Sequence, residues 1–323
     1  MYIYTPDLDK GKLLNETFRV YMNSKAIKAH LALFIAGCMW GLLAPVGKAA
    51  MDAGVTGLSL ASIRMIGAAV FFWIASLFVP KEKVSRRDLF LLFFAGMLCI
   101  VFNLGLFTVV LSLTSPVDST IITTSTPILT MLLAALFLKE PITSVKVIGV
   151  FLGAAGALML IFSNTDGSEL SGNIWGDILC FIAQISFALY LTLFKGLISR
   201  YNVFTLMKWM FTYSAIAIAI VSFRDLSAMA THTFPVQVWL EVGYVVFFGT
   251  FVAYILVLVG QKTLRPTIVS MYNYIQPIVA TIVAVLIGMG TFGWVKALAS
   301  ALIFAGVYVV TQSKSREQML KER

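Results

Sequence analysis

Long apolar stretches alternate with short polar connections along most of the chain. Each stretch has about the 20 residues that an α-helix needs to cross the hydrocarbon core of a bilayer. Because the connections are short, consecutive helices should be antiparallel neighbours. The pattern predicts an all-α polytopic membrane protein with ten transmembrane helices, at residues 30–51, 58–79, 88–112, 116–138, 143–162, 173–197, 203–222, 236–260, 266–288 and 292–312.

The fourth of these stretches is interrupted at its centre by Pro127. A proline within a membrane helix removes a hydrogen bond, which neighbouring protein, hydroxyl side chains or cavity water must replace. Hydroxyl groups are available, because the four residues before the proline are Thr123, Thr124, Ser125 and Thr126. A hydroxyl-rich break in the middle of the membrane is therefore a candidate binding region.

The second half of the chain repeats the first. A shift of about 150 positions pairs Pro127 with Pro277, and a shift of about 147 positions pairs Trp40 with Phe187. Self-similarity at a fixed offset indicates a duplication. The predicted units are an N-terminal tail, two five-helix repeats and a C-terminal tail, at residues 1–29, 30–162, 173–312 and 313–323.

Several short motifs accompany this duplication, namely Trp40-Gly41, Pro127, Leu138-Lys139-Glu140, Gly149 and Gly156. In these motifs the chain resembles the EamA-type drug/metabolite transporter superfamily, over residues 30–312. The resemblance implies ten membrane helices in two inverted halves, and a carrier that exports small organic molecules. The second repeat departs from the first, because Gly290 stands where the first has Glu140.

Composition excludes a soluble protein. Of 323 residues, 59% are hydrophobic and 12% are charged, and the mean hydropathy is +0.92, so charges are too few to cover a soluble surface. The net charge of +9 comes from short loops rather than from one polar domain, so nucleic acid is not an expected partner. Cys38, Cys99 and Cys180 lie singly in apolar stretches, and the chain has two histidines, so we expect no disulfide, no metal site and no cofactor.

Basic residues collect on one side of the predicted membrane. That side carries 20 of the 24 lysines and arginines, whereas the other side carries Arg224 and Lys296. Loops rich in lysine and arginine face the cytoplasm. We therefore expect a multi-pass protein of the bacterial inner membrane with both termini in the cytoplasm. Five helices per repeat would place the two repeats in opposite orientations.

Ten side chains within the apolar stretches are candidates for substrate contact: Trp40, Asn103, Thr123, Thr126, Gln184, Tyr190, Tyr254, Tyr272, Asn273 and Gln276. Asn273 and Gln276 stand at the positions of Thr123 and Thr126 in the second repeat. An amide needs partners that one helix cannot supply, so these two should face protein, water or substrate. Alternatively, the hydroxyls bond carbonyls one turn back, the tyrosines anchor at the membrane interface, and the other groups pack helices together.

Three charged residues and two prolines are further candidates. Arg64, about two turns inside the second helix, must face a wet cavity or an acid, or extend to the headgroups. Lys48, near the outer end of the first helix, and Glu241, early in the eighth, could form gate ion pairs or bind a charged substrate; extension to the interface is the alternative. Pro127 and Pro277 are candidate hinges, with a static kink as the alternative.

Together these features predict a secondary transporter that moves a small organic metabolite, an amino acid or similar, by alternating access. An uptake carrier for a nucleoside-like or cofactor-like metabolite is the alternative within transport. A membrane-embedded lipid enzyme would need a nucleophile, paired acids or histidine-rich metal ligands at the membrane face, and the sequence has no such cluster. A scaffold would not need matched proline breaks. The expected partners are the substrate and membrane lipid; a coupling proton, and the choice between monomer and homodimer, stay open.

Overall fold

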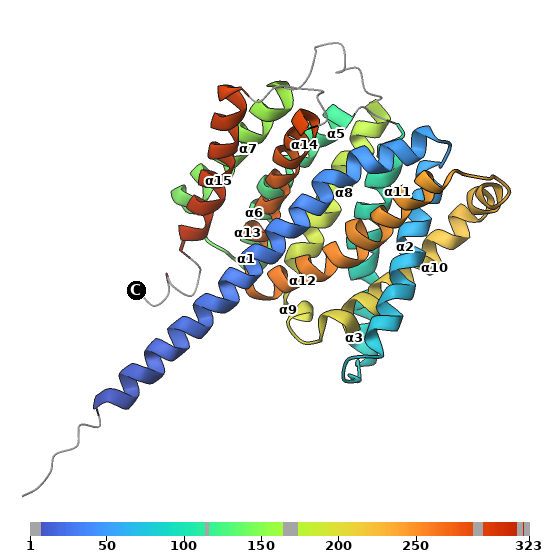
Figure 1. The fold of residues 1–323 in the computed structure, drawn as a ribbon. Coiled ribbons are helices and arrows are strands. Elements are labelled where there is room, and N and C mark those ends of the chain that lie inside the picture. The colour runs from blue at the N-terminus through green and yellow to red at the C-terminus, as the bar shows by residue number, and fades with distance from the viewer. Residues whose placement is uncertain (1–7, 114–115, 164–173, 287–292, 315–318, 320–323) are drawn as a thin grey trace, which may run out of the picture.

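The computed structural model describes residues 8–113, 116–163, 174–286, 293–314 and 319, and within these ranges it contains helices and no β-strand. Figure 1 shows the helices gathered into one bundle. The α-helices are α1 (Leu8–Asp52), α2 (Gly57–Ser76), α3 (Arg86–Gly96), α4 (Leu106–Val110), α5 (Pro116–Thr123), α6 (Thr126–Leu138), α7 (Ser144–Ser163), α8 (Ile174–Leu193), α9 (Lys195–Ile198), α10 (Val203–Ala230), α11 (Val236–Val246), α12 (Ala253–Thr263), α13 (Pro266–Met271), α14 (Ile275–Leu286) and α15 (Trp294–Gln312).

Nine helices in the described ranges are long and apolar enough to cross a membrane. They correspond to nine of the ten predicted stretches. The remaining stretch, the ninth, predicted at 266–288, is divided into α13, the 3-10 turn η4 (Tyr272–Tyr274) and α14, so no single described helix there has the required length. Large apolar side chains face outward, with Phe78 83% and Ile220 77% exposed, as expected of a surface that contacts lipid. The fold is that of an all-α polytopic membrane protein.

The first helix is longer than the sequence predicted. The predicted N-terminal tail ended at residue 29, whereas α1 begins at Leu8 and its apolar part begins at Ser24. Figure 1 shows the start of α1 extending well beyond the bundle. No proline lies between Pro6 and Pro45, and a polar composition by itself does not end a helix.

Two membrane spans contain a π-helical segment at matching positions. The third span runs through α3, η1 (Met97–Gly105) and α4, and the eighth through α11, η3 (Phe247–Val252) and α12. The starts of η1 and η3 differ by the 150 positions that relate the two sequence repeats. π-Helical turns are frequent at functional sites because they interrupt the regular hydrogen-bond ladder.

The fourth and ninth predicted stretches are both broken next to their prolines. α5 ends at Thr123 and α6 begins at Thr126, with Pro127 in its first turn. In the ninth stretch, η4 leads into α14, whose third residue is Pro277. The Thr126 hydroxyl lies 2.7 Å from the Thr123 carbonyl, the group that loses its helical donor at Pro127. The break predicted at Pro127 is therefore present, and the hinge role stays a prediction.

Buried apolar side chains form two clusters. The larger includes Met207, Tyr190 and Leu258, and the smaller includes Leu43 of α1 and Val242 of α11. Trp40 packs against both clusters. The two clusters meet around the cavity described below.

α7 and α15 pack closely along facing glycines. A Cβ atom on Gly306 would lie 2.6 Å from the Gly153 nitrogen and 2.7 Å from the Gly149 oxygen. Small residues allow membrane helices to approach until their backbones touch. The close approach of α7 and α15 therefore depends on the absence of a Cβ atom at Gly306, which faces Gly149 and Gly153.

Gly306→Ala should destabilise the protein, because the backbone of α7 cannot move aside as a flexible side chain would. Overpacking typically costs about 1–3 kcal/mol. We expect the midpoint of thermal unfolding in detergent to fall by several degrees. Gly243→Ala is the matched control, since no atom lies within 4 Å of a Cβ placed there. Equal midpoints for the two variants would contradict the packing account.

Candidate binding cavity

An internal cavity lies among α1, α2, η1, α5, α8, α12 and η4, where the two halves of the chain meet. Its wall contains Trp40, Leu43, Arg64, Asn103, Leu104, Phe107, Thr123, Gln184, Phe187, Tyr254, Asn273 and Gln276. A second chamber shares part of this wall and extends between α5 and α14, where it adds Thr120, Pro277 and Ala280. About 60 Å³ of the first chamber is open to water, which is room for a few water molecules. A metabolite would need side chains to move apart in order to enter.

Seven of the ten predicted contact residues line this cavity: Trp40, Asn103, Thr123, Gln184, Tyr254, Asn273 and Gln276. They come from both halves of the chain and from six different spans. Pro277, one of the two candidate hinges, lines the second chamber. The structure thus brings together groups that the sequence selected one by one.

Three predicted contact residues lie elsewhere. Thr126 is buried behind the wall, with its hydroxyl 2.8 Å from the Gln184 side-chain oxygen. Tyr190 is fully buried in the larger apolar cluster, stacked against Phe187 and Phe194. Tyr272 faces away from the main cavity, and its hydroxyl lies 2.7 Å from His30 Nδ1 in a groove beside α15. A sequence gives the depth of a residue along a helix more readily than the side on which it lies.

Lys48 and Glu241 also lie away from the cavity. Lys48 Nζ lies 3.3 Å from Asp52 Oδ1, one turn further along α1. Glu241 Oε1 accepts a hydrogen bond from Gln237 Nε2 at 3.1 Å. Both groups find a partner on their own helix near the membrane surface, so they do not need a partner across a gate.

Arg64, in contrast, points into the protein. Its side chain is 3% exposed, so it does not extend to the headgroups. Arg64 Nη1 donates to Thr108 Oγ1 at 2.6 Å and Nε donates to Thr250 Oγ1 at 3.0 Å. Of the alternatives for this residue, the structure has the one in which the arginine faces the cavity.

The amides and the indole of the cavity wall are held by backbone carbonyls and by one another. Asn103 Nδ2 donates to the Ala183 carbonyl at 3.0 Å, and Trp40 Nε1 donates to the Gly249 carbonyl at 3.1 Å. Gln276 Nε2 lies 3.5 Å from Asn273 Oδ1, a long contact. The Asn273 and Gln276 amides are therefore the least constrained polar groups of the wall.

The apolar part of the wall was only partly predictable. Phe187 is the repeat mate of Trp40 in the sequence, and their rings are in edge-to-face contact with centroids 6.3 Å apart. That pairing is the signal that could have identified Phe187. Leu43 and Phe107 carry no such signal, because nothing distinguishes them from the other apolar residues of a membrane helix.

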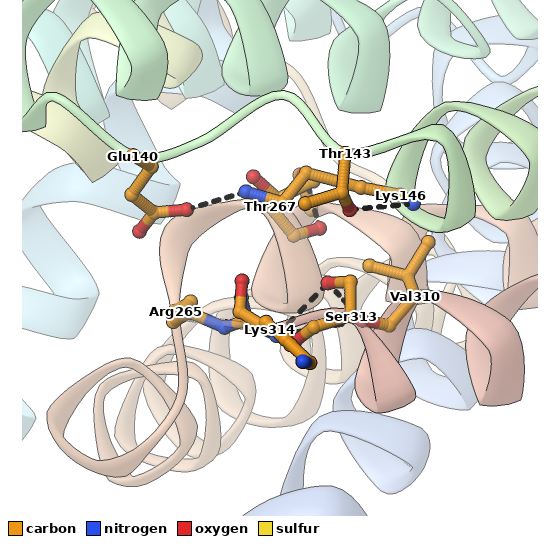
Figure 2. Close-up of polar contacts among 9 residues, drawn as sticks. Glu140, Thr143, Lys146, Arg265, Thr267, Val310, Ser313 and Lys314 are labelled. Carbon is orange, nitrogen blue, oxygen red and sulfur yellow. Dashed lines mark hydrogen bonds and ion pairs between the residues drawn. The ribbon is translucent and has the colours of Figure 1, made fainter. Parts of the chain in front are cut away.

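A polar cluster lies at the other end of the bundle, on the side predicted to be cytoplasmic. α6 ends at Leu138, and Lys139 adopts a left-handed conformation with φ of 53°, which turns the chain toward α7. This turn places Glu140 Oε2 2.9 Å from Lys146 Nζ, with the two side chains 11% and 1% exposed. Figure 2 shows this ion pair beside Arg265, which donates to the Ser313 carbonyl at 2.7 Å.

Two other cations lie close to Glu140. Lys195 donates to the carbonyls of Gln261 and Leu264 at the end of α12, a favourable position for a cation. Burial lowers the pKa of Lys195 to about 8, and Glu140 opposes this shift. Burial also lowers the pKa of Arg265, again opposed by Glu140. Glu140 thus acts on cations from three different elements.

Glu140→Gln should therefore destabilise the protein strongly, because Lys146 would remain charged and buried. Removing one partner of a buried ion pair typically costs about 3–5 kcal/mol. Asp52→Asn is the control: it breaks the exposed Lys48 pair, and exposed pairs contribute about 0–1 kcal/mol. The measurement is thermal unfolding of both variants in detergent. A loss in Glu140→Gln as small as that in Asp52→Asn would refute the structural role.

Comparison with known proteins agrees with this architecture. The model of the EamA-like transporter family matches residues 27–162 and 174–312. The uncharacterized transporter YyaM of Bacillus subtilis is 26% identical over 250 residues, which are 74% of this chain and 80% of that protein. The uncharacterized inner membrane transporter YedA of Escherichia coli is 24% identical over 291 residues, 88% of this chain and 90% of that protein.

One solved crystal structure superposes on 88% of this chain and 96% of its own with a TM-score of 0.70, at 18% sequence identity, which supports the fold alone. The family match is the stronger evidence, because it covers most of the chain in two segments. The chain belongs to the EamA-like transporter family.

Proposed function

We propose that this protein is a secondary transporter that moves a small organic metabolite, an amino acid or a similar compound, out of the cell by alternating access. The observation that best supports the proposal is the position of the cavity. Amides, aromatic rings and one arginine from both halves surround it, and both broken spans reach its wall. Transporters place their substrate sites near the membrane midplane, where discontinuous helices expose backbone groups.

The two ends of the bundle differ in packing, and this difference supports the proposed alternating access. The cavity lies in the half of the bundle that the basic residues assign to the outside. The cytoplasmic half is closed by the larger apolar cluster and by the polar cluster around Glu140 and Lys146. In the described part of that closed half, Tyr190, Gln261 and Thr267 have buried polar side-chain atoms without a hydrogen-bond partner. Buried polar groups without partners are costly, and a conformation that opens this half to water would supply partners for them.

Pro127 and Pro277 are the proposed hinges of this motion. Each stands at the point where a span loses its regular hydrogen bonds, and Pro277 also lines the second chamber. Cavity-lining residues in the described ranges include no aspartate or glutamate. A coupling proton would therefore not be carried by a carboxylate of the described cavity wall.

The proposal is tested by uptake of a labelled metabolite panel into proteoliposomes, with and without a pH gradient. If Asn273 and Gln276 contact the substrate, replacing either by leucine should lower substrate affinity about tenfold, or about 1.4 kcal/mol. If the amides only hold helices together, substrate affinity should stay near that of the wild type and the loss of stability should be small, since interhelical hydrogen bonds in membranes average about 0.6 kcal/mol. Gln237→Leu, at the exposed end of α11, is the control. Unchanged affinity in both cavity variants would place the site elsewhere, and a panel with no transported solute would refute the function.

The proposed orientation has its own test. Single cysteines at Ser227 and Lys83, both exposed, lie at opposite ends of the bundle. In a background without Cys38, Cys99 and Cys180, an impermeant thiol reagent added to intact cells should label Ser227→Cys. Lys83→Cys should react only after the membrane is permeabilised. Labelling of both positions from outside would contradict the proposed topology.

A further inference from the structure

The charge of Arg64 is not balanced by any acid that the structure describes nearby. The three ion pairs in the described ranges involve Lys48, Lys146 and Arg200. Neither chamber of the cavity has an aspartate or glutamate in its wall. A buried cation inside a membrane is costly unless it is paired or faces a wet cavity. The cavity therefore carries a net positive charge.

Hydroxyl groups hold the guanidinium of Arg64 in place. Thr108 donates its own hydroxyl proton to the Leu104 carbonyl at 2.7 Å, and Thr250 donates to the Val245 carbonyl at 2.8 Å. Their oxygens are thus left to accept from Arg64, and they do so at 2.6 and 3.0 Å. Thr250 lies in π-helical η3 and Thr108 follows π-helical η1, so the irregular turns of both halves support one side chain.

Arg64 also retains donors for a ligand. Guanidinium has five N–H groups. The described contacts occupy three of them, and the third contact is a long one, 3.5 Å from Nη2 to the Gly249 carbonyl. The planar fork of arginine matches the two oxygens of a carboxylate. The site is therefore preorganised for an anion before any anion arrives.

The rest of the wall indicates what the anion is attached to. Trp40 has ring contacts with Phe187 and with Tyr254, with centroids 6.3 and 5.7 Å apart, so an apolar or aromatic body would find a matching surface. The amides can satisfy one or two polar substituents. A primary ammonium group, by contrast, would meet a cationic cavity with no carboxylate in its wall.

We propose that the cavity selects small organic carboxylates with an apolar or aromatic body, bound through Arg64, and that an amino group is not required. This inference rests on the proposed transport function and narrows its substrate class. Amino acids remain ligands because of their carboxylate, whereas the corresponding amines are excluded. Arg64 is thus a recognition residue for the carboxylate.

The test compares three probes that share one body: phenylalanine, 3-phenylpropionate and 2-phenylethylamine. Equilibrium binding to the purified full-length protein is measured by calorimetry in detergent. We expect the two carboxylates to bind with similar affinity and the amine at least tenfold more weakly. Equal or tighter binding of the amine, or binding of neither carboxylate, would overturn the inference. This comparison uses the wild-type protein and does not depend on any variant being folded.

Variants then assign the selectivity to Arg64. Arg64→Gln should weaken both carboxylates at least tenfold and leave the amine unchanged or slightly improved, and Arg64→Lys should restore part of the loss. Lys48→Gln removes an equal charge from an exposed pair at the end of α1 and should change none of the three affinities. Wild-type carboxylate affinity in a folded Arg64→Gln would overturn the assignment.

Transport measurements separate this inference from the proposed function. If the carboxylates bind through Arg64 but do not cross proteoliposome membranes, the recognition site stands and the transport function falls. If another solute is transported while the three probes show no preference for the carboxylate, the transport function stands and the inference falls.

Discussion

A membrane interior offers no water to a free backbone group, and this constraint governs where the chain can depart from regular helix. Its described spans depart before Pro127, before Pro277, and at the π-helical segments η1 and η3. Side chains provide hydrogen bonds to backbone carbonyls at these departures. The Thr126 hydroxyl lies 2.7 Å from the Thr123 carbonyl, and the Gly249 carbonyl of η3 accepts a hydrogen bond from Trp40. Irregular backbone can exist only where such partners are present. These departures therefore gather around one cavity.

The same constraint distinguishes Arg64 from Lys146 and Lys195. Lys146 is paired with Glu140, and Lys195 rests on the carbonyls at the end of α12, so both charges are compensated within the closed half of the bundle. Arg64 is held by neutral hydroxyls and keeps its charge for the cavity. Compensated charges stabilise a closed side, and an uncompensated charge attracts a ligand. In the proposed mechanism, closure and recognition thus belong to different ends of the protein.

Much of the fold could be predicted from the sequence, since apolar stretches of membrane length have few alternative structures. The depth of the polar groups was also predictable, and seven of the ten proposed contacts line the cavity. Which side of a helix they face was not, because that depends on packing between distant spans. Tyr190 and Thr126 are buried behind the wall for this reason. The repeat shift related Trp40 to Phe187, whereas the acceptors of Arg64, Thr108 and Thr250, had no signal in the sequence.

The central claim is that one cavity is exposed to each side of the membrane in turn, and it is tested most directly by distances between spin labels in lipid. One pair, at the exposed positions Lys139 and Ser199, spans the closed end; the other, at Leu113 and Leu286, spans the opposite end. Distances are measured by pulsed electron resonance with and without a solute that the transport assay identifies. The account predicts that the first distance lengthens while the second shortens. Two distances that stay fixed, or that lengthen together, would contradict it.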